Sequence, residues 1–574
     1  MRPFPPEAPV SSFKRTLVTS ALPYANGEIH LGHLAGAYLP ADIYVRYLRL
    51  RDREVLYICG SDEYGVPITL TAEKQGITPQ ELVDRNHASI KSSFADFGMS
   101  FDNFSQTSRP IHTETSQAFF ADLHGQDRFR QKTTDQFYSP SQDRFLADRY
   151  IEGTCPKCQA EGARGDQCEA CGSSLDPTEL IDPRNAQDGS PLELRRTTHW
   201  FLPLGDWQQK LERLIETHSE WKENVKQYCR SWFKDGLQDR AVTRDLGWGV
   251  PVPLPDHEGK VFYVWFEAPI GYISATREWA ATQDDPEAWR TWWQDSSTRL
   301  VHFIGKDNVF FHAVMFPAML MAHSEDYILP DNVPANEFLN LEGQKLSTSR
   351  GFAVWLPEYL QKFGADPLRY TLARNAPETR DMNFTWEGFQ ARNDNELGNN
   401  FGNLVNRVFT FIHKYFDGTV PAWSEEQMTD LDRAALAEVE ADLQKWADHL
   451  ERFEVKAALE AAFHAGQVGN RYFDESAPFK SRKTDLERCG HSLGVIVQIL
   501  RMLCLMLAPV TPTAMEKLWS WLGMESDLWQ GGWEEGCRPV PAGRPLGKPE
   551  ILFPRLDEDL VAAEIARLRK LVEE

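Results

Sequence analysis

The sequence lacks several features that would place it outside ordinary globular proteins. It has no run of about 18 uninterrupted apolar residues, so we expect no membrane span. Its first residues, MRPFPPEAPVSSFKR, contain no apolar segment of the kind found in secretory signals. Only 9 of the 574 residues are cysteine, too few for a disulfide scaffold. We therefore expect a globular protein of the reducing cytoplasm, with roughly three to four structural units.

Basic residues are scarce relative to acidic ones. The chain has 61 Lys and Arg against 84 Asp and Glu, which gives a formal net charge of -23 at pH 7. Such a charge favours solubility and repels nucleic acid on average. Any RNA contact is therefore expected to use a local basic or stacking patch.

Four of the cysteines lie close together. Cys155 and Cys158, followed by Cys168 and Cys171, form two Cys-x2-Cys pairs. Two such pairs can hold one Zn²⁺ in a tetrahedron of thiolates at Zn–S distances of about 2.3 Å. Four thiolates close the coordination shell, so we predict one structural zinc rather than a hydrolytic one. The alternative is four free thiols on a surface loop.

The order of apolar segments predicts an α/β protein. A short β-branched segment, RTLVTS, is followed by a Pro/Asn/Gly-rich loop, a stretch with helical spacing and a second strand, EVLYICG. This order indicates a parallel sheet. Residues 127–200 are polar and loop-rich, which indicates an insertion, and strand signals resume at KVFYVWFEAPIGY and RLVHFIGKDNVFFH. From about residue 393 the pattern predicts a mostly helical domain.

The segment PYANGEIHLGHL carries the first candidate for catalysis. His30 and His33 flank Leu31 and Gly32 just before a predicted helix. Two imidazoles at a helix start can hydrogen-bond a phosphate, and Gly32 lets a ligand approach the backbone closely. By itself the pattern fits two histidines that cap a surface turn equally well.

Together the motifs resemble a known family. HLGH after Pro-x-x-Asn-Gly resembles the first signature of class I aminoacyl-tRNA synthetases, and GQKLSTSRG (343–351) resembles the second. GSDEYG, YVWFEAPIGY and HFIGKDNVFFH, with the cysteine pairs, resemble methionyl-tRNA synthetases specifically, over about residues 16–479. The resemblance implies that ATP, with Mg²⁺, and L-methionine form methionyl-adenylate and pyrophosphate. The methionyl group would then pass to the terminal ribose of tRNA(Met), both initiator and elongator.

The resemblance also implies roles around the phosphates. His30 and His33 would hold phosphate oxygens in the transition state, and Lys345 would neutralise the β- and γ-phosphates from a mobile loop. Relatives often have a second lysine where this chain has Thr348, which can hydrogen-bond a phosphate but cannot cancel its charge, so Lys345 would dominate or Arg350 would assist. The implied ATP site comprises Gly32, Gly305, Asp307, Lys345 and Thr348.

A methionine site is implied as well. Asp62 would bind the ammonium group, and aromatic walls would hold the thioether, because sulfur packs well against rings. Tyr272 and His312 would donate weakly to the sulfur. The implied site comprises Leu22, Tyr24, Asp62, Trp265, Ala268, Pro269, Tyr272, Phe311 and His312. The chain departs from the family at Asn308 and Phe316, where relatives often carry Ile and Trp.

In the helical region, Asn399, Asn403 and Arg407 recur every four residues and share one predicted helix face. Amides and a guanidinium can read the base edges of unpaired nucleotides. The resemblance implies that this face reads the CAU anticodon, with an aromatic residue after Ala477-Pro478 stacking on a base. Relatives often have Trp there, whereas this chain has Phe479. The alternative is a solvated Asn/Arg face.

The expected architecture is a doubly wound, Rossmann-like catalytic domain with a zinc-binding connective insertion and a following all-α anticodon-binding domain. Its expected parts are catalytic halves at 1–126 and 246–340, the insertion at 127–245, a lysine–serine loop and stem-contact region at 341–392, and the helical domain at 393–574. No barrel that mediates dimerisation in some relatives is apparent after the last helix, so we expect a monomer.

Two other interpretations compete with this one. Class I synthetases for valine, isoleucine or leucine need a large editing insertion, whereas much of the space before Tyr263 is taken by the cysteine-bearing segment. A cysteine enzyme would use dispersed zinc ligands. A non-catalytic relative with a decayed site is disfavoured because His30, His33, Asp62 and Lys345 are all present.

Overall fold

The computed structural model describes residues 13–573 except 147–149, 166–167, 169, 172–174, 176, 256, 258 and 348–350. The predictions for Thr348 and Arg350 therefore lie outside the described residues.

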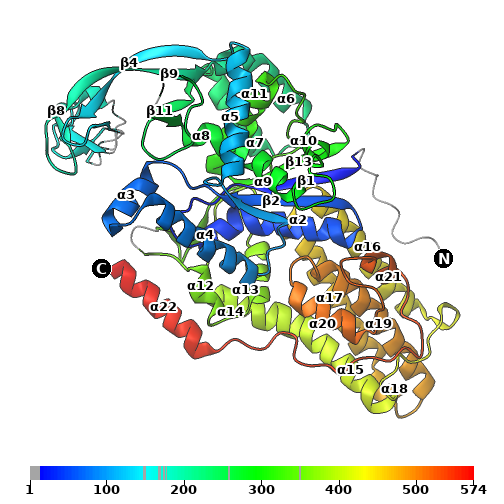
Figure 1. Ribbon diagram of the computed structural model, residues 1–574. Coiled ribbons are helices and arrows are strands. Elements are labelled where there is room, and N and C mark those ends of the chain that lie inside the picture. Colours follow the sequence, from blue (N-terminus) through cyan, green and yellow to red (C-terminus); the bar gives the residue numbers. More distant parts are fainter. Residues whose placement is uncertain are drawn as a thin grey trace.

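A five-stranded parallel sheet in the order β14-β13-β1-β2-β3 forms the centre of the molecule (Figure 1). Its strands are β1 (Arg15–Ser20), β2 (Glu54–Ser61), β3 (Asn103–Gln106), β13 (Thr298–Gly305) and β14 (Ala335–Asn336). The chain starts in the middle at β1, runs outward through β2 and β3, and returns to β13 on the other side of β1. The strand order thus reverses between β1 and β13, and ligands of such sheets bind beyond the carboxyl ends at this point.

Helices cover both faces of the sheet, which confirms the predicted doubly wound fold. Leu17 of β1 packs into one layer and its neighbour Val18 into the other. The first layer contains α5 (Pro110–Gly125), α9 (Ile270–Ala280) and α11 (Phe316–Ala322), and the second contains α2 (Leu39–Leu50), α4 (Pro79–Asp96) and α13 (Ala365–Arg374). Burial on both faces explains why segments such as LYIC carry no polar alternation.

An antiparallel arm leaves the central sheet after α5 and carries the small sheet with β8 at its far end (Figure 1); the cysteine pairs belong to this distal part. The arm is the ladder between β4 (Arg130–Ser139) and β9 (Glu193–Leu202), joined by β5 (Arg144–Phe145) and β10 (Arg240–Ala241). The distal sheet contains β6 (Ile151–Thr154), β7 (Ala163–Arg164) and β8 (Ile181–Asn185). The distal sheet has its own small core, in which Cys155 and Cys168 are buried.

The chain returns from the arm to the central sheet through short helices and strands. These are α6 (Gln208–Thr217), α7 (Glu223–Lys234), β11 (Thr243–Asp245), β12 (Lys260–Phe262), α8 (Val264–Glu267) and α10 (Trp289–Trp293). After β14 a second small sheet forms from β15 (Leu339–Leu341), β16 (Gln344–Lys345) and β17 (Met382–Phe384), with α12 (Leu356–Leu360) between. This sheet places Lys345 beside the carboxyl ends of the central strands.

The remaining described chain is helical. A continuous helical run, α14 (Trp386–Ala391), η7 (Arg392–Gly402) and α15 (Asn403–Tyr415), leads into α16 (Asp430–Glu451), α17 (Val455–Ser476), α18 (Pro478–Ser481), α19 (Leu486–Leu507), α20 (Pro512–Trp521), α21 (Gly532–Gly536) and α22 (Glu558–Glu573). By length and composition α19 is the one helix in the described chain that could cross a membrane, but it is enclosed by its neighbours as a core helix. The predicted helical domain is thus confirmed.

The helical domain packs directly on the domain that contains the central sheet. Tyr47 of α2 stacks edge-on against Trp446 of α16, with ring centroids 5.4 Å apart. Arg369 of α13 pairs with Asp42 of α2 at 2.5 Å and donates to the carbonyl of Val510, which follows α19. Both charged side chains are fully buried, so this junction fixes the two domains relative to each other.

Candidate active site

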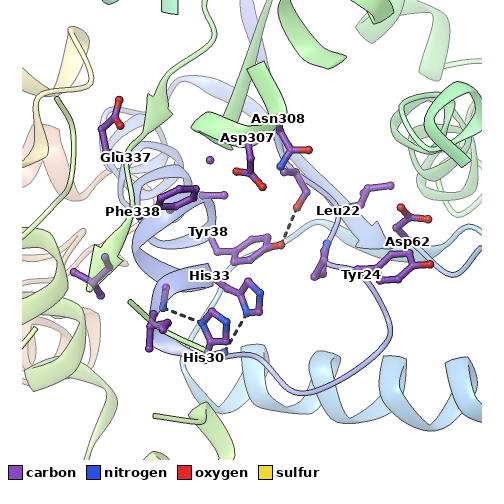
Figure 2. A pocket seen from close by; sticks show the side chains of 18 of the residues that line it. Leu22, Tyr24, His30, His33, Tyr38, Asp62, Asp307, Asn308, Glu337 and Phe338 are labelled. Atoms are coloured by element: carbon purple, nitrogen blue, oxygen red, sulfur yellow. Dashed lines mark hydrogen bonds between the residues drawn. The ribbon is translucent and has the colours of Figure 1, made fainter. Parts of the chain in front are cut away.

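A cavity of about 440 Å³ lies at the point where the strand order reverses (Figure 2). About half of its lining residues lie at or just beyond the carboxyl ends of β1, β2, β13 and β14, and the others come from the histidine motif, the first helical turns, β15, β16 and Leu346. They are Ala21, Leu22, Pro23, Tyr24, His30, Gly32, His33, Gly36, Ala37, Tyr38, Asp62, Gly305, Asp307, Asn308, Glu337, Phe338, Leu339, Lys345 and Leu346. The cavity therefore brings together the histidine motif, Asp62, the GKD motif and the lysine loop, which are far apart in the sequence.

His30 and His33 lie side by side at the start of α1 (Leu31–His33), with their rings stacked 3.7 Å apart. His30 Nδ1 accepts from the amide of Gly32 at 3.1 Å, and His33 Nδ1 accepts from the amide of His30 at 3.2 Å. Because both Nδ1 atoms accept hydrogen bonds, the proton of each neutral ring is on Nε2. Burial lowers the pKa of His30 to about 4 and the pKa of His33 well below its ordinary value. At neutral pH the pair thus offers two uncharged N–H donors.

The lysine loop lies against this histidine motif. A Cβ on Gly32 would come within 2.7 Å of Leu346 Cδ1, so the glycine leaves room for the Leu346 side chain. Lys345 is exposed and forms no ion pair with any described carboxylate; its Nζ lies 5.5 Å from the ring centroid of Phe338. The ammonium group is therefore free to meet an anionic ligand.

Acidic side chains line the β13 and β14 side of the cavity. Asp307 follows Gly305, where a Cβ would come within 2.7 Å of the Asp307 carboxylate, so this glycine makes room for it. Glu337 accepts from Lys306 at 2.8 Å and from the amide side chain of Asn224 in α7 at 2.9 Å. Asp307 is thus placed to accept from hydroxyl groups, while the charge of Glu337 is already compensated.

Asp62 lies at the end of β2 beside Tyr24, as Figure 2 shows. Its Oδ1 atom is shielded from solvent and has no hydrogen-bond partner. Burial, with Glu267 and Glu63 nearby, raises the pKa of Asp62 well above its ordinary value. Tyr24 donates to the carbonyl of Tyr64 at 2.6 Å and so closes this end of the cavity. A cationic group that entered here would pair with Asp62 and restore its ionised form.

Six of the residues predicted to bind methionine do not line the cavity. They are Trp265, Ala268, Pro269, Tyr272, Phe311 and His312. Gly271, next to Tyr272, adjoins the cavity, because a Cβ there would come within 3.1 Å of Cδ1 of the lining residue Leu22. Trp265 is 46% exposed and packs against Phe311 at 4.9 Å.

The predicted hydrogen bonds from Tyr272 and His312 to a sulfur atom are not available in this arrangement. His312 Nδ1 faces the carbonyl of Asn308 at 3.0 Å and must carry the proton there, so Nε2 accepts from the Tyr272 hydroxyl at 2.7 Å. Both protons are used within the protein. The two side chains are also nearly inaccessible, at 1% and 5% exposure.

The four clustered cysteines fit a metal site. Their Sγ atoms all lie within 4.8 Å of one another; Cys155 to Cys171 measures 4.0 Å and Cys158 to Cys168 3.6 Å. A tetrahedral Zn²⁺ with Zn–S bonds of about 2.3 Å requires S···S edges of about 3.8 Å. The donor set and its geometry therefore suit a structural zinc. The cluster is located in the distal sheet, remote along the chain from every cavity residue.

The predicted anticodon residues share one surface of the helical domain. Asn399 and Asn403 are exposed on the run from η7 to α15, and Arg407 is half-buried one turn further on. The Arg407 guanidinium lies 4.5 Å from the ring centroid of Phe473, which in turn lies 6.4 Å from Phe479. Phe479 is 45% exposed just after a left-handed residue, Ala477 (φ 44°), which turns the chain outward.

Tyr38, Glu337 and Phe338 are among the lining residues that sequence analysis did not predict. Tyr38 closes the floor of the cavity by donating to the carbonyl of Ala21 at 2.9 Å, and Glu337 and Phe338 form part of the rim. Glu337 and Phe338 directly follow β14, where the rule for parallel sheets would have located them. However, β14 is only two residues long and gave no strand signal.

The fold and the cavity together define a class I aminoacyl-tRNA synthetase: a doubly wound sheet with a histidine pair and a lysine loop at its switch point, followed by a helical domain. Two family models agree, since "tRNA synthetases class I (M)" matches residues 16–409 and "Anticodon binding domain of methionyl tRNA ligase" matches residues 420–569. The chain belongs to the methionine–tRNA ligase family, and its activity is that of a class I aminoacyl-tRNA ligase specific for methionine.

Individual relatives support this placement. The methionine–tRNA ligase of Bacteroides fragilis (strain YCH46) is 52% identical over 564 residues, covering 97% of this chain and 81% of the relative, and that of Salinibacter ruber (strain DSM 13855 / M31) is 49% identical over 584 residues, covering 97% and 82%. A solved structure of Mycobacterium tuberculosis methionyl-tRNA synthetase in complex with methionyl-adenylate superposes with a TM-score of 0.77 at 27% identity, covering 94% of this chain and all of that one.

Proposed function

We propose that the cavity described above is where this chain activates L-methionine with ATP and then transfers the methionyl group to tRNA(Met), both initiator and elongator. The observation that carries this proposal is that two uncharged imidazole donors, a free ammonium group and a solvent-shielded carboxylate converge on one cavity. The M. tuberculosis relative was solved with methionyl-adenylate, and we propose the same intermediate here.

In the first step, Asp62 binds the methionine ammonium group and orients the carboxylate for in-line attack on the α-phosphate. The Nε2–H groups of His30 and His33 donate to oxygens that gain charge in the transition state, which is the kind of preorganised stabilisation that contributes most to such reactions. Lys345 neutralises the β- and γ-phosphates. Mg²⁺, which accompanies ATP, supplies further charge neutralisation on the phosphates.

The adenosine end of ATP lies on the opposite side of the cavity. Asp307 accepts from the ribose hydroxyls, and Gly32 and Gly305 line the same cavity. The prediction that the Thr348 hydroxyl donates to a phosphate oxygen stays a prediction, because this residue lies outside the described residues. The methionine side chain extends past Leu22 and Tyr24 toward Trp265 and the residues around it, and access to these residues requires a rearrangement that methionine binding induces.

Two further parts complete the assignment. The cysteine cluster holds one structural Zn²⁺ and stabilises the distal sheet. Asn399, Asn403, Arg407 and Phe479 bind the CAU anticodon, the first three through base edges and Phe479 by stacking. The monomeric state and the cytoplasmic location stay predictions; sedimentation analysis and cell fractionation test them.

Amino-acid-dependent ATP–pyrophosphate exchange, measured over a panel of amino acids, tests the main proposal. We expect exchange with methionine and weaker exchange with homocysteine, because an apolar pocket separates single methylenes by only about 1–3 kcal/mol. Exchange with valine, isoleucine, leucine or cysteine in preference to methionine would contradict the assignment. Transfer to tRNA with a CAU anticodon, against the same tRNA with an altered anticodon, tests the second step.

A further inference from the structure

A row of aromatic rings leads from the side of the cavity to the surface of α7. Trp265 packs against Phe311 at 4.9 Å, Phe311 against Phe310 at 5.6 Å, and Phe310 against Trp232 at 4.6 Å. The row is buried in its middle and open at both ends, with Trp265 46% and Trp232 36% exposed. Tyr228, one helical turn before Trp232, is 41% exposed as well. The exposed rings are therefore Trp265 at one end and Trp232, with Tyr228 one turn away, at the other, while Phe310, which is 6% exposed, packs behind Trp232.

A guanidinium group without a carboxylate partner covers this surface. Arg240 Cζ lies 5.3 Å from the ring centroid of Trp232 and 4.8 Å from that of Phe310. Its Nε atom is buried without a hydrogen-bond partner, and it forms no ion pair with any carboxylate that the structure describes. The neighbouring Asp239 pairs instead with Arg130 at 3.2 Å and Lys132 at 2.8 Å. In a chain of net charge -23, Arg240 is thus a locally uncompensated cation on an aromatic platform.

This platform adjoins the mouth of the cavity. Phe310 follows Asp307 and Asn308 by two to three residues, and both of these line the cavity. The first turn of α7, the helix that carries Trp232, contacts the cavity rim through Asn224, which donates to Glu337 at 2.9 Å. Trp232 lies about 12 Å further along α7, so an extended ligand that leaves the cavity on this side and follows the helix reaches Trp232 and Arg240.

We propose that Trp232, Phe310 and Arg240 form a binding platform for the single-stranded 3′ end of tRNA. This rests on the function proposed above, in which the terminal ribose hydroxyl must reach the cavity. An unpaired base has a flat π-face that stacks on an exposed tryptophan, and a guanidinium on the same surface binds the adjacent phosphate. Stacking does not depend on which base is present, because every base has a flat π-face. This suits a 3′ end that has to be guided into the cavity rather than recognised by its sequence.

The test is aminoacylation with Trp232→Ala and Arg240→Met. We expect either substitution to raise KM for tRNA by about tenfold, the scale of one lost stacking or phosphate contact. Methionine-dependent pyrophosphate exchange and the KM for ATP should not change, because no cavity residue is altered. Trp232→Phe, which retains a ring, should recover most of the affinity. Arg290→Met is the matched control, because Arg290 also lies over a tryptophan, Trp289, at 4.6 Å but outside the platform.

Two readouts separate this platform from a structural role. In competition assays, tRNA lacking its single-stranded 3′ nucleotides should bind wild-type and Trp232→Ala protein equally, whereas intact tRNA should not. The dependence of log KM on log salt should become shallower by about 0.7 in Arg240→Met, the slope expected for one phosphate contact on a single strand, and should not change in Trp232→Ala. An equal loss with intact and truncated tRNA, or unchanged tRNA affinity, overturns the proposal. A changed KM for ATP assigns the platform to the nucleotide instead and also overturns it, while loss of all pyrophosphate exchange in the wild-type protein contradicts the proposed function itself.

Discussion

Removal of one imidazole from the cavity is expected to slow adenylation sharply without a charge being lost. His30 and His33 are both uncharged at neutral pH, and each directs only Nε2–H toward a ligand, because Nδ1 is used by a backbone amide. His33→Ala or His30→Ala deletes one donor that acts in the transition state, which costs about 10²–10³ in rate, or about 3–4 kcal/mol.

The two rings are stacked 3.7 Å apart, so each holds the other in place. The effects of substitutions at residues in direct contact are not additive in free energy. The double alanine variant should therefore lose less activity than the product of the two single fold-losses. His33→Gln retains an amide donor on a side chain of similar length and should recover part of the rate. ATP–pyrophosphate exchange at saturating methionine measures each value, with circular dichroism as a check on folding.

The pH dependence provides an independent test of the same reasoning. Burial holds the pKa of His30 at about 4, below the 6.5 of an exposed histidine, so the ring in the free protein stays neutral from pH 8 down to about pH 5. Since an unfolded histidine already binds a proton near pH 6.5, this ring stabilises the fold fully above that pH, and its contribution is lost as the pH falls toward 4. NMR titration of the ring protons reads the pKa directly. A His30 pKa near 6.5, or an alanine variant that retained more than a third of wild-type exchange, would refute the neutral-donor mechanism.

Other perturbations test separate parts of the structure. Lys345→Ala should lower pyrophosphate exchange by about 10²–10³, and an unchanged rate would remove this lysine from the reaction. Asp62→Asn should raise KM for methionine at least tenfold and leave KM for ATP unaltered, as steady-state exchange kinetics would measure; equal effects on both would assign Asp62 to general folding. Cys158→Ser should reduce bound zinc, measured by elemental analysis, from about one per chain toward zero, with near-wild-type zinc content as the contrary outcome. Arg369→Met removes one of the two arginine partners of buried Asp42, which keeps its ion pair with Arg46 at 2.9 Å. It should lower the free energy of unfolding in urea by about 1–3 kcal/mol, the scale of lost charge-assisted hydrogen bonds; a loss below about 0.5 kcal/mol would show that the Arg369 pair is solvated.

Short contiguous motifs were predictable from the sequence because the residues that shape the backbone and the side chains that bind a ligand lie within a few positions of each other. The histidine motif and Asp62 follow the ends of β1 and β2, where a parallel sheet brings polar loops to one edge. The cysteine pairs define a metal geometry by spacing alone, and the Sγ distances agree with it. The every-four spacing of Asn399 and Asn403 also survives folding, because both side chains are exposed along one continuous helical run.

Features that depend on contacts between distant residues were not predictable in the same way. Tyr272 and His312 are 40 residues apart in sequence, and nothing local reveals that the hydroxyl of one donates to the other at 2.7 Å. The buried pair of Asp42 and Arg369 joins segments 327 residues apart, and neither residue has a distinctive neighbourhood in the sequence. Such pairs follow from the packing of whole helices, which composition and periodicity do not specify.

Charge placement explains how so acidic a chain handles two anionic substrates. Many basic side chains are held in ion pairs, as Arg299 is with Asp331 and Arg374 with Glu396. Because the carboxylate cancels the charge of its partner, such pairs attract anionic substrates little. The groups that face the ligands in the proposed mechanism are different in kind: two neutral N–H donors at the reacting phosphate, and Lys345 without an ion pair to any described carboxylate. Long-range repulsion from an excess of 23 negative charges is weakened by salt, whereas contacts at bonding distance are screened much less. The protein can thus remain soluble and repel RNA over most of its surface while it retains attraction at the few positions where phosphates must be bound.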